Sequence, residues 1–392
     1  MTVGTYQVWP KKLVIGSGSI EQLPEEVRLF GAKRVILFTD EGLVNLPLIE
    51  HAQQLLKQAG YEVLLFGKIG PNPTDTMVEE AVTEMKKFSP DAIVCIGGGS
   101  PLDAAKAANV IYTHGGHPAD YDIAIGGIEH IAPKLLPFIA VPTTAGTGSE
   151  VTWVGVITDT KKQIKYGIIS PFLVPDVAIL DAELTVSLPK NSTAYTGADA
   201  LTHLIEAYVS NVGFPIADAM CLHGIKMVRD VLPKAVKNGR DLKAREDMLV
   251  ASMMAGAAFT INNLGLCHQM AHQLSAYCGL PHGLANAVLL PHVMRYNLDA
   301  NYKKFGDIAD ALGEDIRGLS DVEAAELAVM AVENLFSEIE IPKYLNGTGA
   351  DYSRVPEMAA SAIVDAVGCN TNPKQTSLED CIAVFEEAFS EG

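Results

Sequence analysis

Potential metal ligands recur at helical spacing in the second half of the chain. Asp199 and His203 lie four residues apart, His268 and His272 repeat that spacing, and His282 follows in a Pro-His-Gly turn. In an α-helix, residues four apart lie on one face, so each pair presents both side chains in one direction. Buried imidazoles and carboxylates need partners, and a divalent cation supplies one. Any one histidine would usually be an ordinary core or surface residue, but the clustering predicts a metal site.

The spacing of His268 and His272 is also that of the zinc proteases. Gln269 stands where those enzymes carry their catalytic glutamate, which excludes protease chemistry. Aspartate and histidine ligands without a thiolate suit Fe²⁺, Zn²⁺, Mn²⁺ or Ni²⁺ and do not select among them. Cys267 and Cys278 lie nearby, but their spacing is not that of a closed structural zinc site.

Two glycine-rich loops in the first half have the composition of phosphate-binding loops. Residues 96–103 (IGGGSPLD) and 142–150 (PTTAGTGSE) each follow an apolar run, and the first opens a helical pattern. Glycine lets backbone N–H groups approach a ligand, and a helix N-terminus attracts an anion. Alternatively, both are only tight turns. Neither loop matches the GxGxxG fingerprint of dinucleotide-binding proteins. The nearest match, residues 16–21 (GSGSIE), has glutamate in place of the last glycine and is discounted.

Three further residues of the first half are candidates for contact with a dinucleotide. Asp40 follows the first strong apolar run, where a carboxylate can accept hydrogen bonds from a ribose and repel a 2′-phosphate. Taken alone, Asp40 reads more readily as a helix N-cap. Asn72 either contacts the cofactor or makes a turn, and Lys165 either reaches ribose hydroxyls or is a solvated strand residue.

The predicted secondary structure changes along the chain, from alternating strands and helices in the first half to helices alone in the second. Predicted strands cover residues 34–39, 62–66, 92–96 and 138–141, with helical segments such as 45–59 and 76–88 between them. Strands that alternate with helices imply a parallel sheet covered on both faces. After Pro189, helical patterns cover residues 198–210, 216–232, 242–261, 266–276 and 324–338. We expect a dinucleotide-binding α/β domain with a Rossmann-like sheet over residues 1–185 and an all-helical, metal-binding and catalytic domain over residues 186–392.

Composition excludes several classes of protein. The chain has 392 residues, of which 48% are hydrophobic and 19% charged, so it is not intrinsically disordered. A net charge of −18 argues against a nucleic-acid or anionic-membrane partner, because both need a basic face. The six cysteines show no CxxC spacing and read as reduced thiols. The N-terminus lacks an apolar signal-peptide core, so we expect a cytoplasmic protein.

In order along the chain, these motifs resemble the iron-containing (group III) alcohol dehydrogenases. The resemblance runs nearly end to end, through residues 39–40, 71–74, 97–100, 143–150, 199–208 and 265–297. It implies a Rossmann-like N-terminal domain and an all-helical C-terminal domain, the architecture shared with dehydroquinate synthase. It also implies a homodimer or larger homo-oligomer.

The resemblance assigns roles residue by residue. The metal, with Fe²⁺ expected and Zn²⁺, Mn²⁺ or Ni²⁺ as alternatives, would be held by Asp199, His203, His268 and His282. His272 would be catalytic, beside the substrate and the nicotinamide and not on the metal. NAD(H) would be bound by Asp40, Asn72, Gly98, Gly99, Ser100, Thr143, Thr144, Thr147, Val154 and Lys165. Family members often carry Gly, Pro and Gly where this chain has Gln269, Gln273 and Ser275. The resemblance therefore does not define the shape and polarity of the substrate pocket.

The expected function is metal-dependent hydride transfer between a small primary alcohol or aldehyde and NAD(H). The metal would act as a Lewis acid on the substrate oxygen. One alternative is a metal- and NAD-dependent lyase of the dehydroquinate synthase type, but the metal region has almost none of the basic residues that a phosphorylated, carboxylated substrate needs. The other is a non-enzymatic dinucleotide or metal sensor, which the full set of ligands together with His272 disfavours.

Overall fold

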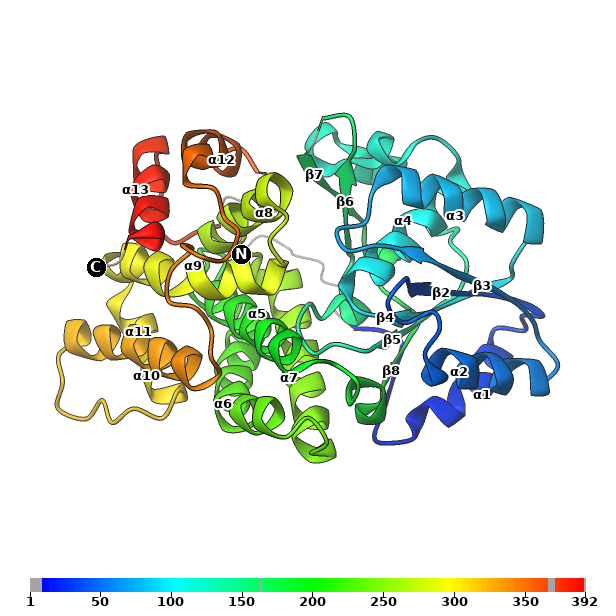
Figure 1. Cartoon of the computed structure of the whole chain (residues 1–392), viewed down its shortest axis with the longest axis horizontal. Helices are drawn as coiled ribbons and strands as arrows, with labels where there is room; N and C mark the ends of the chain where they lie inside the picture. Colours follow the sequence, from blue (N-terminus) through cyan, green and yellow to red (C-terminus); the bar gives the residue numbers. More distant parts are fainter. Residues whose placement is uncertain (1–8, 163, 366–370, 391–392) are drawn as a thin grey trace. The chain divides into compact units, whose positions relative to one another are not determined.

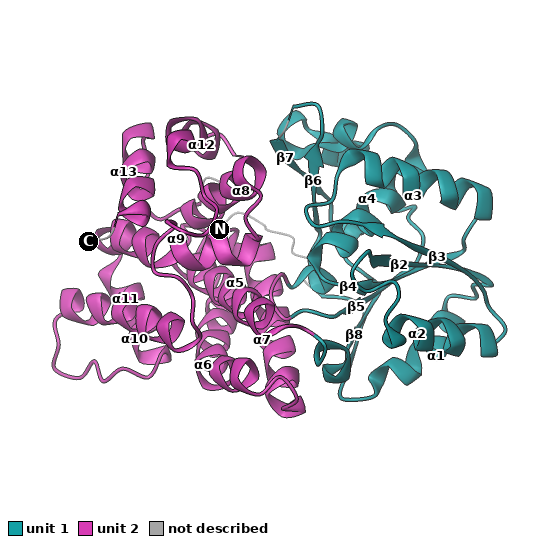
Figure 2. Ribbon diagram, in the orientation of Figure 1, with its two compact units in different colours: residues 1–144, 148–187 teal, residues 145–147, 188–392 magenta. Residues whose placement is uncertain are grey.

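The computed structural model describes residues 9–162, 164–365 and 371–390, so Gln163 and Cys369 lie outside the described residues. The chain divides into two compact units (Figure 2). Unit 1 comprises residues 1–144 and 148–187, and unit 2 comprises residues 145–147 and 188–392. The three residues Ala145–Thr147 therefore group with the second unit, although both flanks of that segment belong to the first.

Unit 1 is built on a six-stranded parallel sheet with the strand order β1-β8-β5-β4-β2-β3 (Figure 1). The strands are β1 (Lys12–Ile15), β2 (Arg34–Asp40), β3 (Glu62–Ile69), β4 (Ala92–Gly97), β5 (Phe138–Pro142) and β8 (Val177–Leu180). Every residue of β4, β5 and β8 is buried. Their unbroken apolar runs fit this position, since a strand covered on both faces has no solvent side to alternate with.

Helices cover both faces of this sheet. They are α1 (Leu23–Leu29), α2 (Pro47–Gln58), α3 (Asp75–Phe88) and α4 (Gly99–His114). Alternate residues of β2 enter different cores: Val35 and Leu37 pack with α1 and α2, whereas Ile36 and Phe38 pack with α3 and α4. The two-residue period of a strand produces this division, and Figure 1 shows the two pairs of helices on opposite faces.

A separate antiparallel hairpin completes unit 1. It consists of β6 (Val154–Asp159) and β7 (Ile164–Ile169) and packs against α4. The hairpin follows the second glycine-rich loop directly, so the contacts of β6 bear on how that loop is held.

Within its described residues, unit 2 contains helices and no strand. The helices are α5 (Lys190–Val209), α6 (Pro215–Lys237), α7 (Leu242–Asn262), α8 (Leu266–Cys278), α9 (His282–Asn297), α10 (Tyr302–Ala311), α11 (Asp321–Glu338), α12 (Val355–Ala362) and α13 (Leu378–Phe389). Helix α5 packs against α6, α7 and α9, and its residues from Gly197 to Val209 are all buried. It is therefore a core helix whose polar side chains must find partners inside the protein.

The predicted fold class is confirmed, a parallel α/β unit followed by a helical one. Helix α5 begins at Lys190, eight residues before the predicted start, because the polar residues of its first turns hid the helical period. The sequence patterns did not predict α1, β1, β6, β8, α9, α10, α12 or α13; most of these elements are short, and α9 is buried on nearly every side, which removes the amphipathic period. No single described helix is long and apolar enough to cross a membrane; only the pair α7 and α8, bent by 109°, passes that test together.

Candidate metal centre and dinucleotide loops

Three of the four predicted metal ligands converge inside unit 2. Asp199 comes from α5, His268 from α8 and His282 from the first position of α9. One ligand atom from each lies within 4.8 Å of the other two. Oδ1 of Asp199 is 3.8 Å from Nε2 of His268 and 3.7 Å from Nε2 of His282. Asp199 and His268 are buried, whereas the His282 side chain is 27% exposed, which leaves one side of the cluster accessible.

The side-chain amide of Asn286 lies among the three acceptor atoms of this cluster. Its Nδ2 donates to Asp199 Oδ1 at 2.7 Å and lies 3.1 Å from Nε2 of both His268 and His282. An NH₂ group has two protons for these three acceptor atoms, so Asn286 alone cannot satisfy all of them. A divalent cation satisfies several lone pairs at once, and one carboxylate with imidazole nitrogens is a donor set suited to Fe²⁺. The residues present therefore fit a metal.

Glu206 orients one of these ligands. Its Oε2 lies 2.5 Å from Nδ1 of His268, and its Oε1 accepts the backbone N–H of Cys267 at 2.7 Å. With the proton on Nδ1, Nε2 of His268 offers its lone pair to the cluster. Burial raises the pKa of Glu206 to about 8 against the lowering effect of nearby backbone N–H groups. The sequence held a signal for Glu206, since it lies three residues after His203 on the same helix face, but the motifs alone predicted no role for it.

His203 lies beside the cluster without joining it. Its ring stacks on that of His268, with centroids 4.4 Å apart, and on Phe259, with centroids 4.7 Å apart. The three-residue ligand group does not include it. Burial lowers the pKa of His203 to about 3, so the imidazole is neutral, which is the form that binds metals. The role of His203 as the fourth ligand stays a prediction.

His272 occupies a distinct position one helical turn after His268. Its Nδ1 lies 2.7 Å from Oδ2 of Asp365, and its ring stacks on that of His282, with centroids 5.4 Å apart. Gln273 also donates to Oδ2 of Asp365, at 3.3 Å. The carboxylate of Asp365 thus fixes the orientation of the imidazole. Asp365 lies 93 residues from His272, so no local pattern in the sequence indicates it.

In unit 1 the first glycine-rich loop lies beside the start of the second. The N–H of Thr143 donates to the carbonyl of Gly97 at 3.0 Å, and a Cβ on Gly98 would lie 3.2 Å from Oγ1 of Thr144. Helix α4 begins at Gly99, directly after β4, so its N-terminus opens at the carboxyl end of the sheet. In open parallel sheets ligands bind at that end, and a helix N-terminus there favours phosphate. The structure thus brings together Gly98, Gly99, Ser100, Thr143 and Thr144.

Asn72 and Lys165 meet although they are far apart in the sequence. Lys165 Nζ donates to Oδ1 of Asn72 at 2.9 Å. Asn72 has a φ of 55°, a left-handed conformation that asparagine tolerates in turns. Asn72 therefore makes a turn and also contacts a second predicted cofactor residue, so the structure is compatible with a role in the turn and with a role in cofactor binding.

The remaining predicted cofactor residues fall in three places. Oδ1 of Asp40 accepts the N–H groups of Gly42 and Leu43, so the carboxylate caps a turn, and burial raises its pKa. A Cβ on Gly97 would lie 3.4 Å from Oδ2 of Asp40, which places that oxygen at the first loop. Val154 begins β6, whereas Thr147 groups with unit 2. Ribose binding by Asp40 stays a prediction.

Comparison with known proteins decides the family. Residues 10–182 match the model of iron-containing alcohol dehydrogenases, and residues 193–389 match that of the C-terminal part of the Fe-containing alcohol dehydrogenase family. The chain belongs to the iron-containing alcohol dehydrogenase family. This confirms the resemblance found in the sequence motifs.

Individual relatives of this alcohol dehydrogenase family cover almost the whole chain. The 1,3-propanediol dehydrogenase of Klebsiella pneumoniae is 41% identical over 97% of both chains. The NAD-dependent methanol dehydrogenase of Bacillus methanolicus is 38% identical over 97% of this chain and 98% of its own. The solved structure of a 1,3-propanediol oxidoreductase has a TM-score of 0.95 and 41% identity, and covers 99% of this chain and 100% of its own.

The chain is thus an NAD(H)-linked, metal-dependent oxidoreductase of alcohols and aldehydes, with Fe²⁺ as the family's metal. The predicted activity and cofactors are confirmed at this level. No finding favours the lyase alternative.

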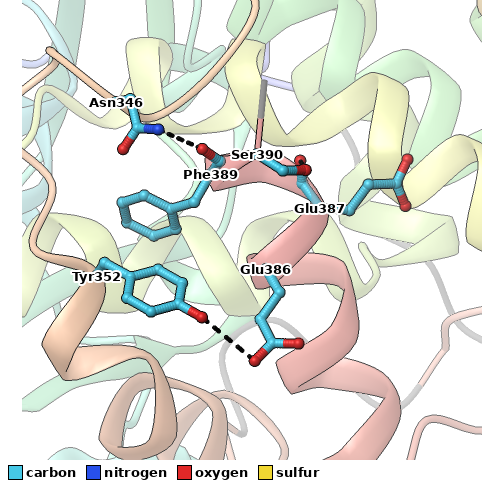
Figure 3. Close-up of a pocket in the computed structure, with 6 residues that line it drawn as sticks. All are labelled: Asn346, Tyr352, Glu386, Glu387, Phe389 and Ser390. Atoms are coloured by element: carbon cyan, nitrogen blue, oxygen red, sulfur yellow. Dashed lines mark hydrogen bonds between the residues drawn. The ribbon is translucent and has the colours of Figure 1, made fainter. Parts of the chain in front are cut away.

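A hollow elsewhere in unit 2 has no part in this site. It has a volume of about 640 Å³ and is lined by Asn346, Tyr352, Glu386, Glu387, Phe389 and Ser390 (Figure 3). The Tyr352 hydroxyl contacts Glu386 at 3.4 Å, and Asn346 donates to the carbonyl of Phe389. None of the lining residues belongs to the metal centre or the loops.

Proposed function

We propose that this enzyme interconverts a short primary alcohol and its aldehyde, with 1,3-propanediol the first alcohol to test. The observation that carries the proposal is the convergence of Asp199, His268 and His282 within 4.8 Å in a member of this family. Relatives named for 1,3-propanediol and methanol, at 41% and 38% identity, support a small substrate.

In the proposed site each residue has a physical task. Asp199, His203, His268 and His282 hold the metal, while Glu206 and Asn286 orient these ligands. The cation, when bound, supplies Lewis acidity toward the substrate oxygen, and the nicotinamide exchanges the hydride. Asp365 holds Nδ1 of His272, so this catalytic imidazole presents Nε2 to the reacting groups. Its role is either to move a proton or to orient the substrate.

The dinucleotide is assigned to unit 1. Residues 1–185 form the proposed dinucleotide-binding domain and residues 186–392 the metal-binding and catalytic domain. The start of α4 and the Thr143–Thr144 segment provide N–H groups and hydroxyls for phosphates. The Asp40 carboxylate favours NAD(H) over its 2′-phosphorylated form, because a second negative charge beside it is repelled.

A coupled assay of metal content and activity tests the proposed function. The enzyme, loaded with Fe²⁺, is assayed with NAD⁺ and 1,3-propanediol, ethanol or methanol, and with NADH and the corresponding aldehydes. His268→Ala and His282→Ala should lose both bound metal and turnover. His223→Ala changes an exposed histidine of α6 and should retain both. Full turnover of a metal-free His268→Ala enzyme would overturn the metal's role, and no turnover of any alcohol or aldehyde by the loaded enzyme would overturn the substrate class.

We also propose a cytoplasmic homodimer or larger homo-oligomer without a nucleic-acid or membrane partner. The net charge of −18 argues against a nucleic-acid or anionic-membrane partner, and the free thiols of the described cysteines Cys95, Cys221, Cys267, Cys278 and Cys381 support a reducing compartment. The homo-oligomer is proposed from the family resemblance.

A further inference from the structure

Lys106 is a buried cation that the proposed mechanism does not use. It lies in the second turn of α4, the helix that begins in the first glycine-rich loop, and is 1% exposed. A lysine this deeply buried must replace the hydration of its ammonium group with protein acceptors. The residues that do so indicate what Lys106 holds in place.

Among the described residues, the hydrogen-bond acceptors of the Lys106 ammonium group all come from one short segment. Nζ donates to the carbonyl of Ser149 at 2.7 Å and to its Oγ at 2.9 Å. Oγ1 of Thr152 at 3.0 Å and the carbonyl of Val154 at 2.8 Å also lie within hydrogen-bond distance of Nζ, so its three protons are shared among four acceptors. This segment, residues 149–154, is the end of the second glycine-rich loop and the start of β6. The ammonium group therefore ties α4 to the chain that leaves the second loop.

Asp103, one turn earlier on α4, binds the same segment with the opposite charge. Its Oδ1 accepts the hydroxyl of Ser149 at 2.8 Å, and its Oδ2 accepts the N–H of Val156 at 3.1 Å. Gly155 lies between these contacts, where a Cβ would come within 3.1 Å of the Asp103 carbonyl. The backbone of β6 can thus lie directly on α4, and the two charged side chains fix its register there.

The pKa of Lys106 is consistent with an ammonium group that stays charged near neutral pH. Burial lowers the pKa of Lys106 to about 8, although the neighbouring Asp103 and Glu150 raise it. At pH 7 the ammonium form therefore dominates, and its charge strengthens each of its hydrogen bonds.

We propose that Lys106, with Asp103, is a positioning residue that sets the second glycine-rich loop against the start of α4 and so determines the affinity for the dinucleotide. The inference rests on the proposed function, in which both loops hold the cofactor. A phosphate held by two loops needs both at the correct separation, and Lys106 joins the helix of one to the end of the other.

Binding of NAD⁺ to three variants tests this proposal. Lys106→Met removes the charge with little change in length, Lys106→Arg retains the charge, and Thr152→Val removes one acceptor. Lys57→Met, at an exposed position of α2, is the matched control. The dissociation constant is measured by calorimetry, together with metal content, kcat at saturating NAD⁺ and the near-ultraviolet circular dichroism that reports folding.

We expect Lys106→Met to raise the dissociation constant of NAD⁺ at least tenfold, with metal content and kcat at saturation retained. Lys106→Arg should recover part of the affinity, and Thr152→Val should show a smaller loss. Unaltered affinity in folded Lys106→Met would overturn the proposal. If Lys106→Met does not fold, unaltered affinity in Thr152→Val overturns it. Failure of the unaltered enzyme to bind NAD⁺ would instead overturn the proposed function.

Discussion

A single side chain outside the proposed ligand set orients one of the proposed metal ligands. The carboxylate of Glu206 contacts Nδ1 of His268 at 2.5 Å, which turns Nε2 of that ring toward Asp199. Partners of this kind usually contribute about 10- to 100-fold to metal affinity, because they fix both the tautomer and the angle of the ring.

Glu206→Ala should therefore weaken Fe²⁺ binding by about 10- to 100-fold. Glu206→Gln, which retains an acceptor oxygen for the His268 N–H, should weaken it less. Competition with a chelator measures the affinity, and Glu326→Ala, at an exposed glutamate of α11, serves as the control. Equal affinity in Glu206→Ala and the unaltered enzyme would remove Glu206 from the centre.

Glu150 is a buried carboxyl group whose pKa is raised above its ordinary value. Its Oε1 has no hydrogen-bond partner among the described residues, and burial raises its pKa from 4.5 to about 7. Between pH 4.5 and pH 7 the folded state keeps a proton that the unfolded state has released. Stability should therefore fall as the pH rises through this window, by about 1.4 kcal/mol for each unit between the two pKa values.

Glu150→Gln should remove this pH dependence, because the amide does not titrate. Thermal unfolding midpoints at pH 5 and pH 7.5 provide the measurement. The unaltered protein should lose more stability between these two pH values than the variant does. Parallel losses in the two proteins would show that Glu150 titrates normally.

At the scale of elements, the metal centre depends on how closely α9 approaches α5. Gly283 follows His282 in the first turn of α9, and a Cβ there would lie 2.4 Å from the carbonyl oxygen of Tyr195 in α5. That contact is too short for any side chain, so only glycine lets His282 come within reach of Asp199 on α5.

Gly283→Ala should displace the first turn of α9 and reduce Fe²⁺ affinity at least tenfold. The control is Gly306→Ala in α10, where the added Cβ would meet only the Cβ of Ala324, at 3.3 Å. Metal content after dialysis distinguishes the two variants. Retention of metal by Gly283→Ala at the level of the control would show that the α5–α9 contact does not set the ligand geometry.

At the scale of the whole molecule, the two units should respond to different ligands. All the proposed metal ligands belong to unit 2, whereas nine of the ten proposed cofactor residues belong to unit 1 and only Thr147 does not. A ligand stabilises the unit that binds it, by about 2.7 kcal/mol when its concentration is 100 times its dissociation constant.

Removal of the metal should therefore lower the melting temperature of unit 2 more than that of unit 1, and NAD⁺ should raise that of unit 1. Differential scanning calorimetry with and without chelator, and hydrogen exchange to assign each transition to a unit, would test this. A chelator that left the stability of unit 2 unchanged would contradict the placement of the metal.

Features that depend on local spacing can be predicted from the amino-acid sequence. The i, i+4 pairs of Asp199 with His203 and of His268 with His272 are visible because a helix repeats every 3.6 residues. The glycine-rich loops and buried strands are equally local, since a strand and the turn after it are contiguous in the chain. Fold class and the presence of a metal site could therefore be predicted from local patterns, whereas the choice of Asp199, His203, His268 and His282 as its ligands came from the family resemblance.

The side chains that support those residues can be identified only in the folded chain. Asp365 reaches His272 across 93 residues, Glu206 reaches His268 across 62, and Lys106 reaches Ser149 across 43. No periodic pattern links such positions, because contacts between elements depend on how helices and strands pack. The sequence therefore showed the candidate ligands, and packing determined the carboxylates, amides and buried lysine that orient them.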